Sequence, residues 1–332
     1  MKLYVISGVA GMTGNELVRQ ILLEGDFVIG FDNFFASSVE TIEDCLENEH
    51  FEFYEYDLND AGDMEKIEQH VQKKKKNVEE VIYINCAAVV HTEYFYHVEA
   101  TFQTNVNGMK AFLEQAIRVK ADKFLNCSTS EVYSMNSWNE EGGVREDAYL
   151  SMATAEHSER TSYAVGKLLT EFFILDAVRE KKIKGCSMRF ANVYSRNERF
   201  PKHIIPHIII SLRDTGGVVL LENSKENCRT FLNNYDSCSA VLKLAQTETA
   251  LDGTVYNVAT DEEISILELV HLCAEKMGIS NPKIRFEGYR KADPKRRILS
   301  TEKLKSRTDW KPQVGLNQGL EMCIRNYLGK KG

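Results

Sequence analysis

The stretch SGVAGMTGNEL, residues Ser7–Leu17, decides the fold. It places Gly8, Gly11 and Gly14 at GxxGxxG spacing, directly after the apolar run LYVIS (Leu3–Ser7). Such glycines allow a tight turn between a buried strand and a helix, and the N–H groups at the start of that helix bind phosphate well. A glycine triplet alone is weak evidence for a dinucleotide site, but a position between a predicted strand and an amphipathic helix strengthens it. The stretch therefore predicts a dinucleotide site.

The pattern around this stretch repeats along the first half of the chain. Near-continuous apolar runs, typical of strands buried on both faces of a parallel sheet, occur at Leu3–Ser7, Phe27–Asp32, Val81–Ala88 and Lys123–Thr129. Helical patterns lie between them, as in ELVRQILLEG, which has one apolar face and ends at Gly25. Strands that alternate with helices predict an α/β fold with a Rossmann-type doubly wound parallel sheet.

Two carboxylates follow predicted strands. Asp32 ends the second strand, where it can accept hydrogen bonds from an adenosine ribose and would repel a 2′-phosphate, so the sequence favours NAD over NADP. Asp57, in YEYDLND, follows the third strand and can reach the adenine. The alternatives are a plain glycine turn with Asp32 as a capping residue, and an ordinary loop aspartate at position 57.

Composition sets the class of protein. The chain has 332 residues, 43% of them hydrophobic, and a formal net charge of −8, which argues against a general nucleic-acid binder. The one basic run, Lys73–Lys76, is typical of a solvated helix end. No apolar run reaches the roughly 20 residues that span a bilayer, and no charged leader precedes the first strand, so we expect a cytoplasmic protein without membrane contact. Eight scattered cysteines lack ligand spacing, which argues against a metal site and a disulfide framework.

The chain divides unevenly. We expect an NAD-binding domain over residues 1–185 and a smaller α/β part over 186–332 that mainly binds substrate. GCSMRFANVY, from Cys186, predicts another strand, followed by mixed helices and short strands. No linker rich in Pro, Gly or Ser separates the halves, so this boundary is soft and later segments can return to the first domain.

TSYAVGKLLTEFF places Tyr163 and Lys167 four residues apart, on one face of a helix. A free phenol, with a pKa of about 10, is a poor base at neutral pH. A nearby ammonium group and an oxidised nicotinamide would favour the phenolate, which could take a proton from a substrate hydroxyl while hydride leaves for NAD. YxxxK also occurs by chance in helices, so it gains weight only from the glycine stretch.

With these motifs the sequence resembles the extended short-chain dehydrogenase/reductase family, in its nucleotide-sugar epimerase/dehydratase branch. The resemblance runs nearly end to end, through SGVAGMTG, FDNF, NCAA, STSEVY, YAVGK, RFANVY and CRTFLNNYDS. It implies a homodimer and an NAD site formed by Gly8, Gly11, Met12, Thr13, Gly14, Asp32, Asn33, Asp57, Leu58, Ala87, Ala88, Asn105, Tyr163 and Lys167. It also implies that Asn192, Arg229 and Arg290 hold the diphosphate and ribose of a nucleotide sugar. Alternatively, the two arginines are surface ion-pair partners.

The sequence departs from the family's pattern in three places. Ser134 and Ser195 stand where a glycine usually follows VY, and Asn85 replaces a usual histidine. The proline-rich approach to Tyr163 is absent. These departures bear on the substrate rather than on the fold.

NCSTSEVYSM (Asn126–Met135) carries the residues that distinguish reactions. By the resemblance, Thr129 bonds the reacting 4-hydroxyl alongside Tyr163. Glu131 stands where dehydratases have the carboxylate that removes the C5 proton, which is α to a carbonyl once C4 is oxidised. Ser130 precedes it, so Glu131 would act as both base and acid. A capping role for Glu131 is the alternative.

We therefore expect an NAD-dependent nucleotide-sugar enzyme, most simply a 4,6-dehydratase that works through a 4-keto intermediate. The TSE triplet also resembles UDP-glucuronate decarboxylases, so loss of carbon dioxide is an alternative. A 4-epimerase or a 4-dehydrogenase is another. The non-enzyme alternative, an NAD-binding scaffold or sensor, would not need Thr129, Tyr163 and Lys167 together.

Overall fold

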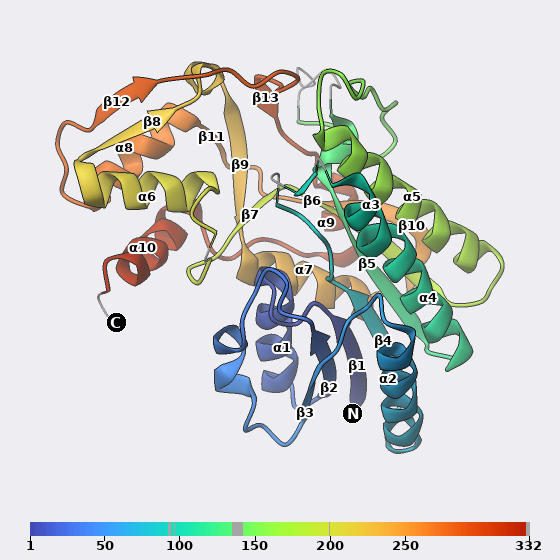
Figure 1. The fold of residues 1–332 in the computed structure, drawn as a ribbon. Coiled ribbons are helices and arrows are strands. Elements are labelled where there is room, and N and C mark those ends of the chain that lie inside the picture. Colours follow the sequence, from blue (N-terminus) through green and yellow to red (C-terminus); the bar gives the residue numbers. More distant parts are fainter. Residues whose placement is uncertain (92–93, 96, 135–141, 199, 330–332) are drawn as a thin grey trace.

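The computed structural model describes residues 1–91, 94–95, 97–134, 142–198 and 200–329. Within these residues, a seven-stranded sheet carries helices on both faces, and a smaller part with short strands and helices lies beyond one end of it (Figure 1). Every strand pair in the large sheet is parallel. The predicted α/β fold with a doubly wound parallel sheet is confirmed.

The order of the strands fixes where a ligand can bind. In the described chain the order is β10-β6-β5-β4-β1-β2-β3. The bounds of these strands are β1 (Lys2–Ser7), β2 (Phe27–Asp32), β3 (Phe51–Glu55), β4 (Glu80–Asn85), β5 (Lys123–Thr129), β6 (Lys184–Phe190) and β10 (Asp252–Val258). The chain winds one way through β1–β3 and the other way through β4–β6. The direction changes between β1 and β4, and ligands of open α/β sheets bind beyond the carboxyl ends of the strands at such a point.

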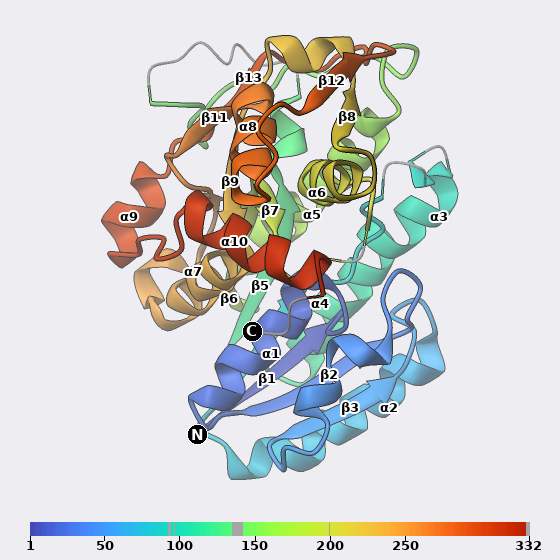
Figure 2. The same ribbon diagram turned by 90° about the vertical axis from the view of Figure 1, so that its left-hand side faces the viewer.

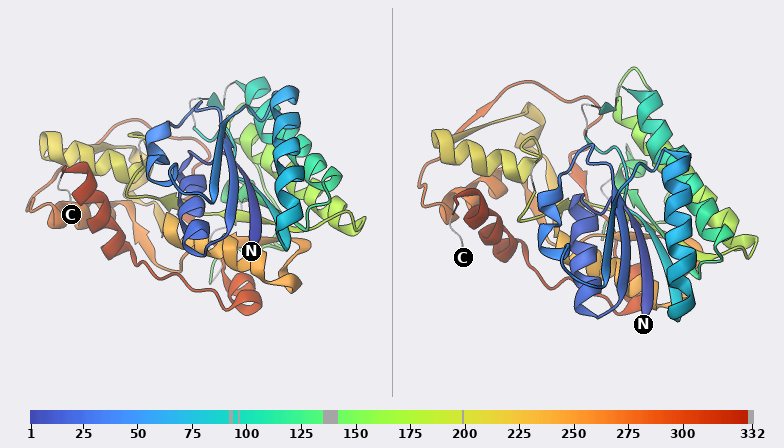
Figure 3. Two further views of the ribbon diagram at one scale, coloured as in Figure 1. Left: turned by 90° about the horizontal axis from the view of Figure 1, so that it is seen from below. Right: turned by 60° about the horizontal axis from the view of Figure 1, so that its bottom comes forward.

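Both faces of the sheet are covered by helices (Figure 3). One face packs against α1 (Met12–Leu23), α7 (Asn234–Gln246) and α9 (Glu302–Thr308). The other packs against α2 (Ala61–Lys74), α4 (Met109–Arg118) and α5 (Arg160–Arg179). Successive strand residues point to opposite faces, so Tyr4 and Ile6 enter one core while Leu3 and Val5 enter the other. Burial on both sides explains the continuous apolar runs.

One region differs from the sequence expectation in detail. The pattern of NVNGMKAFLEQAIRV (residues 105–119) predicts one continuous helix. In the structure, α3 (Val98–Phe102) continues through a π-helical turn, η5 (Gln103–Gly108), into α4. The buried Asn105 lies in this turn and exchanges two hydrogen bonds with the backbone of Val89, at 2.7 and 3.0 Å. A π-turn often marks a functional site because it re-aims a side chain. Here it fixes the loop after β4.

Shorter helical turns connect the main elements. These are η1 (Val39–Thr41), η2 (Glu43–Cys45), η3 (Lys75–Asn77), η6 (Ser130–Tyr133), η7 (Glu222–Lys225) and η8 (Glu248–Ala250). The basic run Lys73–Lys76 falls at the end of α2 and in η3, where a solvated helix end was expected.

The smaller part is built around β9 (Figure 2). Its strands are β7 (Asn192–Tyr194), β8 (Gly217–Leu220), β9 (Cys228–Asn233), β11 (Glu263–Ser265), β12 (Lys283–Phe286) and β13 (Arg296–Arg297). Its helices are α6 (Ile204–Thr215), α8 (Ile266–Lys276) and α10 (Leu316–Tyr327), which share a separate apolar core. The chain returns to the large sheet through α7 and β10. No helix in the described residues combines the length and the apolar character needed to cross a bilayer.

Candidate active site

A cavity of about 690 Å³ opens at the carboxyl ends of the central strands, a volume typical of ligand sites. Its wall contains most of the residues that the sequence singled out. These are Gly8, Gly11, Met12, Thr13, Gly14, Asp32, Asn33, Asp57, Leu58, Ala87, Ala88, Thr129, Tyr163 and Lys167. Segments more than 150 residues apart in the chain thus meet in one space, at the point where the winding direction of the sheet changes.

The glycine turn forms a cradle between β1 and α1. Gly8 has a φ of +73°, and a Cβ atom added there would lie 2.7 Å from the backbone nitrogen of Ala87. A Cβ at Gly14 would collide with the carbonyl oxygen of Gly8. Gly11 is the N-cap residue of α1, and no side chain of the described chain caps this helix end. The backbone can therefore approach a diphosphate closely, with the positive end of the helix dipole facing it.

Asp32 is placed to meet a ribose. Its Oδ2 accepts a 3.0 Å hydrogen bond from the backbone N–H of Ala10, and its Oδ1 accepts bonds from Phe34 N at 2.8 Å and Ser37 Oγ at 3.0 Å. Its neighbour Asn33 donates to Asp57 Oδ2 at 3.0 Å, which ties the loops after β2 and β3 together. The fixed carboxylate and the glycine cradle fit a dinucleotide with an unphosphorylated ribose.

Tyr163 and Thr129 lie together in the cavity wall. Thr129 ends β5 and Tyr163 lies in the first turn of α5, and the Thr129 hydroxyl lies near enough to the phenol to lower its pKa. Phe95 stacks on the Tyr163 ring, with 4.7 Å between the ring centroids. Burial raises the pKa of the Tyr163 phenol, and the nearby Thr129 hydroxyl only partly opposes this. In the protein alone the phenol is thus protonated at neutral pH, because desolvation outweighs nearby charges.

Lys167 follows Tyr163 by one turn of α5 and is buried. Its ammonium group donates a 2.9 Å hydrogen bond to the carbonyl oxygen of Cys127 in β5. Burial lowers the pKa of Lys167. The lowering of the Tyr163 pKa expected from the YxxxK spacing is therefore absent from the protein alone, and it depends on a positive charge that a bound oxidised nicotinamide would add.

Glu131 is held by two arginines and lies outside the described cavity wall. Arg297, in β13, donates to its Oε1 at 2.5 Å, and Arg160 donates to Oε2 at 3.1 Å. Burial would raise the pKa of the Glu131 carboxyl, but the charges of Arg297 and Arg160 outweigh burial and hold that pKa well below its usual range. The side chain is 13% exposed. Ser130, its neighbour, is buried and also outside the wall.

Further charges surround this carboxylate. Arg229 forms an ion pair with Asp293 at 2.9 Å, and burial lowers the pKa of Arg229 to about 10. Burial and the nearby Arg160 lower the pKa of Arg290, whose backbone N–H bonds Asn223. Among the described residues, four arginines thus face two carboxylates, and we call this group the arginine cluster (Arg160, Arg229, Arg290, Arg297, Glu131 and Asp293). Its positive excess lies beside Tyr163, whose phenol senses both Glu131 and Arg160.

The three predicted phosphate and ribose ligands are not in the described cavity wall. Arg229 and Arg290 belong to the arginine cluster, and Asn192 donates to the carbonyl oxygen of Thr230 at 3.0 Å. Asn105 also lies outside the wall, where it pins the loop after β4. These four residues surround the site rather than line it in this structure.

Several wall residues were missed by sequence reasoning. His91, Glu198, Phe200 and His203 line the cavity on the side of the smaller part. Phe200 stacks on His91 with 4.0 Å between the centroids, and His203 Nδ1 bonds the carboxylate of Glu198. Their position in a segment after a predicted strand end was the one available signal. Arg160 could have been found more directly, because it precedes Tyr163 by three residues on the same helix.

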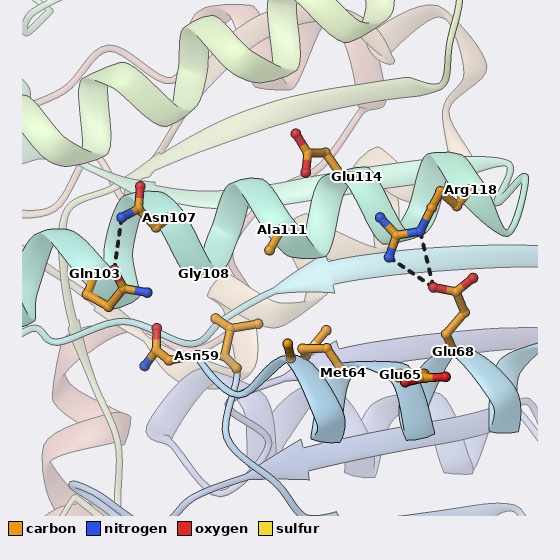
Figure 4. A pocket seen from close by; sticks show the side chains of 12 residues that line it. Asn59, Met64, Glu65, Glu68, Gln103, Asn107, Gly108, Ala111, Glu114 and Arg118 are labelled. Carbon is orange, nitrogen blue, oxygen red and sulfur yellow. Dashed lines mark hydrogen bonds and ion pairs between the residues drawn. The ribbon is translucent and has the colours of Figure 1, made fainter.

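A smaller hollow of about 290 Å³ lies between α2, η5 and α4 (Figure 4). Asn107 donates to Gln103 at 2.9 Å at one end, and Arg118 bonds Glu68 at 2.9 Å at the other. Of its other polar residues, Asn59 donates to Thr104 at 3.1 Å and Glu114 accepts from Lys110 at 2.6 Å, and the hollow contains neither Tyr163 nor Thr129. We therefore assign the chemistry to the larger cavity.

Comparison with known proteins identifies the family. The model of the GDP-mannose 4,6 dehydratase family matches residues 5–323. The chain belongs to this family. The expected membership of the NAD-dependent nucleotide-sugar epimerase/dehydratase branch of the extended short-chain dehydrogenases is confirmed, and the protein is a nucleotide-sugar dehydratase, epimerase or decarboxylase by family.

Relatives within the family differ in their reactions. UDP-glucuronic acid decarboxylase 4 of Arabidopsis thaliana is 26% identical over 325 residues, which cover 97% of this chain and 68% of that protein. A dTDP-glucose 4,6-dehydratase from Streptomyces venezuelae, solved with NAD and TYD bound, has a TM-score of 0.84 at 22% identity and covers 99% of this chain and 98% of that one. A UDP-glucuronic acid 4-epimerase from Bacillus cereus, solved with UDP-glucuronic acid and NAD, has a TM-score of 0.85 at 22% identity, with 99% of each chain covered.

Proposed function

We propose that the protein uses NAD to oxidise C4 of a nucleotide sugar and that the 4-keto intermediate then loses a group at C5 or C6. The observation that carries this proposal is that Tyr163 and Thr129 lie together in the wall of the cavity that also holds the glycine cradle. A phenol and a threonine hydroxyl that line the same cavity can both form hydrogen bonds with one hydroxyl of the substrate. NAD would supply the hydride acceptor.

Each of the site residues has a defined task in the oxidation of C4. Tyr163 takes the proton of the 4-hydroxyl, and Thr129 orients that hydroxyl and favours the phenolate. Lys167 holds a positive charge one helical turn away, anchored on Cys127. Asp32 bonds the adenosine ribose and disfavours a 2′-phosphate, which supports NAD over NADP. Phe95 keeps the phenol ring in place by stacking.

The second step is suggested by the arginine cluster. A 4-keto hexuronate loses carbon dioxide readily, since the electrons of the broken C5–carboxylate bond pass into the ketone and form an enolate. The enolate then takes a proton at C5 from water or a nearby acid, so no base is needed at C5. The positive excess beside Tyr163 suits a substrate that carries a carboxylate. We therefore favour decarboxylation of a nucleotide hexuronate. The 26% identity to a UDP-glucuronic acid decarboxylase supports this choice.

Dehydration to a 4-keto-6-deoxy sugar is the second candidate. Glu131 follows Thr129 by two residues and could face C5 after a change in its ion pairs. A dehydratase needs this carboxylate to take the C5 proton and return it to the leaving hydroxyl. Its depressed pKa makes it a weak base, because two guanidinium groups stabilise the ionised form. This weakens the dehydratase proposal relative to decarboxylation.

Product mass separates these reactions. The purified protein is incubated with NAD and UDP-, GDP-, CDP- and dTDP-sugars, among them glucuronates. A product lighter by carbon dioxide supports decarboxylation, one lighter by water supports dehydration, and an unchanged mass supports epimerisation. If no sugar is converted and NAD is never reduced, the protein is a scaffold or sensor and the proposed catalysis is wrong.

We also propose where the nucleotide of the substrate binds and which surface forms a homodimer. The nucleotide would lie along His91, Phe200 and His203, with Asn192, Arg229 and Arg290 near its phosphates and ribose.

A second copy of the chain would cover an exposed apolar stripe, formed by Val165, Leu169 and Phe172 on α5 with Val98 and Phe102 on α3. The three α5 residues have i, i+4, i+7 spacing, which is typical of a helix face that packs. A cytoplasmic location stays a prediction from the sequence.

A further inference from the structure

Two cysteines face each other in the wall of the cofactor cavity. Cys86 follows β4 and Cys127 lies in β5, and their sulfur atoms are 3.8 Å apart. The two strands are parallel neighbours in which Asn85 lies opposite Asn126. Cys86 and Cys127 directly follow these two residues, so they lie opposite each other as well. Neither cysteine is in a disulfide, and both residues are partly exposed.

The geometry of this pair permits a disulfide. Neighbouring strands lie about 4.8 Å apart, within the range of roughly 4.4–6.8 Å between Cα atoms that a disulfide spans. The sulfurs would have to approach each other by about 1.8 Å, since a disulfide bond is about 2.05 Å long. Small rotations about the Cα–Cβ bonds, with a slight shift of the strand ends, would achieve this.

A third thiol lies near but is engaged elsewhere. Cys238, in α7, donates to the carbonyl oxygen of Thr13 at 3.3 Å and is fully buried. No group of three His, Cys, Asp or Glu residues in the described part of the chain has the arrangement of a metal site. The pair is therefore better suited to thiol–disulfide chemistry than to metal binding.

The backbone at both cysteines supports the cofactor site. The carbonyl oxygen of Cys127 is the acceptor for Lys167 Nζ at 2.9 Å. The N–H of Cys86 donates to the carbonyl oxygen of Ser7 at 3.1 Å. The backbone of the next residue, Ala87, packs against Gly8. A covalent link between the two cysteines would move the anchor of Lys167 and the floor of the glycine cradle together.

We propose that Cys86 and Cys127 form a redox-reactive dithiol that a low-molecular-weight disulfide oxidises in the cofactor-free protein, and that the resulting disulfide weakens dinucleotide binding. One cysteine attacks the small disulfide, forms a mixed disulfide and releases one small thiol. The second cysteine attacks the protein-bound sulfur and releases the other small thiol. In sum, two protein thiols and one small disulfide give one protein disulfide and two small thiols.

This inference does not depend on the sugar or on the reaction in "Proposed function"; it requires only that the cavity takes a dinucleotide. The cavity gives the small disulfide its route to the sulfurs, so a bound dinucleotide would block that route. Hydrogen bonding to Cys127 and burial raise the pKa of Cys86. Oxidation should therefore be slow at neutral pH and faster as the pH rises, because the thiolate is the attacking form.

The test equilibrates the full-length protein in buffers of reduced and oxidised glutathione, with and without NAD, and follows the intact mass. We expect a loss of about 2 Da, for two hydrogens, and a peptide map that links Cys86 to Cys127. NAD affinity of the oxidised protein, measured by calorimetry, should fall roughly tenfold. By linkage, NAD should shift the thiol–disulfide equilibrium toward the thiols by the same factor.

Three variants control the test. Cys86→Ser and Cys127→Ser should each abolish the mass change, and their NAD affinity in reducing buffer shows whether they are folded. Cys228→Ser removes the third partly accessible cysteine of the described chain, which is not in the cavity wall, and should leave the mass change and its NAD dependence intact. An unchanged mass in oxidising buffer, a disulfide at other cysteines, or an oxidised protein with unaltered NAD affinity would each overturn the proposal.

Discussion

The guanidinium group of Arg297 donates a hydrogen bond of 2.5 Å to Glu131, a residue 166 positions earlier in the chain. Arg160 donates to the same carboxylate from α5. This contact joins β13 of the smaller part to η6, the turn that follows β5 of the large sheet. The residue that would have to act as base in a dehydratase is thus part of the structure that holds the two parts of the protein together.

Glu131→Gln should lower the free energy of unfolding at pH 7 by about 2–4 kcal/mol, since it leaves two mostly buried guanidinium groups without their carboxylate. The folded pKa of Glu131 is depressed, so its stabilisation is fully present above the unfolded pKa of about 4.3 and is lost as the pH falls below that value. Urea titrations of both proteins between neutral and acidic pH measure this. A stability difference that stays constant down to pH 3 would contradict the assigned ion pairs.

Tyr163→Phe should slow C4 oxidation by about 10³-fold while leaving NAD affinity largely unchanged, because the phenol is the proposed proton acceptor. The pH profile gives a second readout. Oxidation should speed up as the pH rises, since burial raises the phenol pKa and the phenolate is the reactive form. Thr129→Val removes a hydroxyl that lowers this pKa, so its profile should shift to higher pH, whereas Thr129→Ser should retain the wild-type profile. Full activity of Tyr163→Phe would rule out its role.

The sequence was sufficient for the fold and for the local motifs. Gly8 and Gly14 were predicted from spacing, and the structure shows a side chain at either one would meet backbone atoms. Tyr163 and Lys167 were predicted from helical periodicity, which is a local property. The large sheet followed from apolar runs, because burial on both faces leaves a continuous pattern.

Contacts between distant residues were not predictable from the sequence. Nothing in the local pattern brings Arg297 to Glu131, or Cys86 to within 3.8 Å of Cys127, because strand order and register create these contacts. Spacing does not report burial either, so the raised pKa of the phenol in the protein alone was not predictable. The expected lowering by Lys167 together with an oxidised nicotinamide stays a prediction. The return of β10 to the large sheet likewise depends on tertiary packing.

Asp32→Ala should weaken NAD binding by about tenfold and reduce the preference for NAD over NADP, because the negative charge at the ribose is lost. Ser37→Ala is the matched control, since it removes a hydroxyl that bonds Asp32 Oδ1 but keeps the carboxylate. Calorimetric titration of both cofactors gives the two affinities. An unchanged NAD/NADP ratio in Asp32→Ala would show that Asp32 only shapes the loop.

Phe172→Asp should convert a dimer to a monomer, because it places a charge in the centre of the exposed stripe on α5, where Phe172 is 58% exposed. Leu23→Asp is the control, since Leu23 is 86% exposed on α1, away from the stripe. Light scattering after size-exclusion chromatography gives the mass of each species. A wild-type monomer, or a dimer that survives Phe172→Asp, would exclude this surface as the interface.

Hydride transfer from C4 is the most direct test of the central claim, that Tyr163 and Thr129 direct oxidation of one sugar carbon. The protein with NAD is mixed rapidly with a nucleotide hexuronate that carries deuterium or hydrogen at C4, while the absorbance of reduced nicotinamide is followed. We predict a transient rise that is slower with deuterium, and a lighter product that keeps the label at C4. A lighter product formed without any reduced nicotinamide, or with the C4 label lost to solvent, would contradict the account.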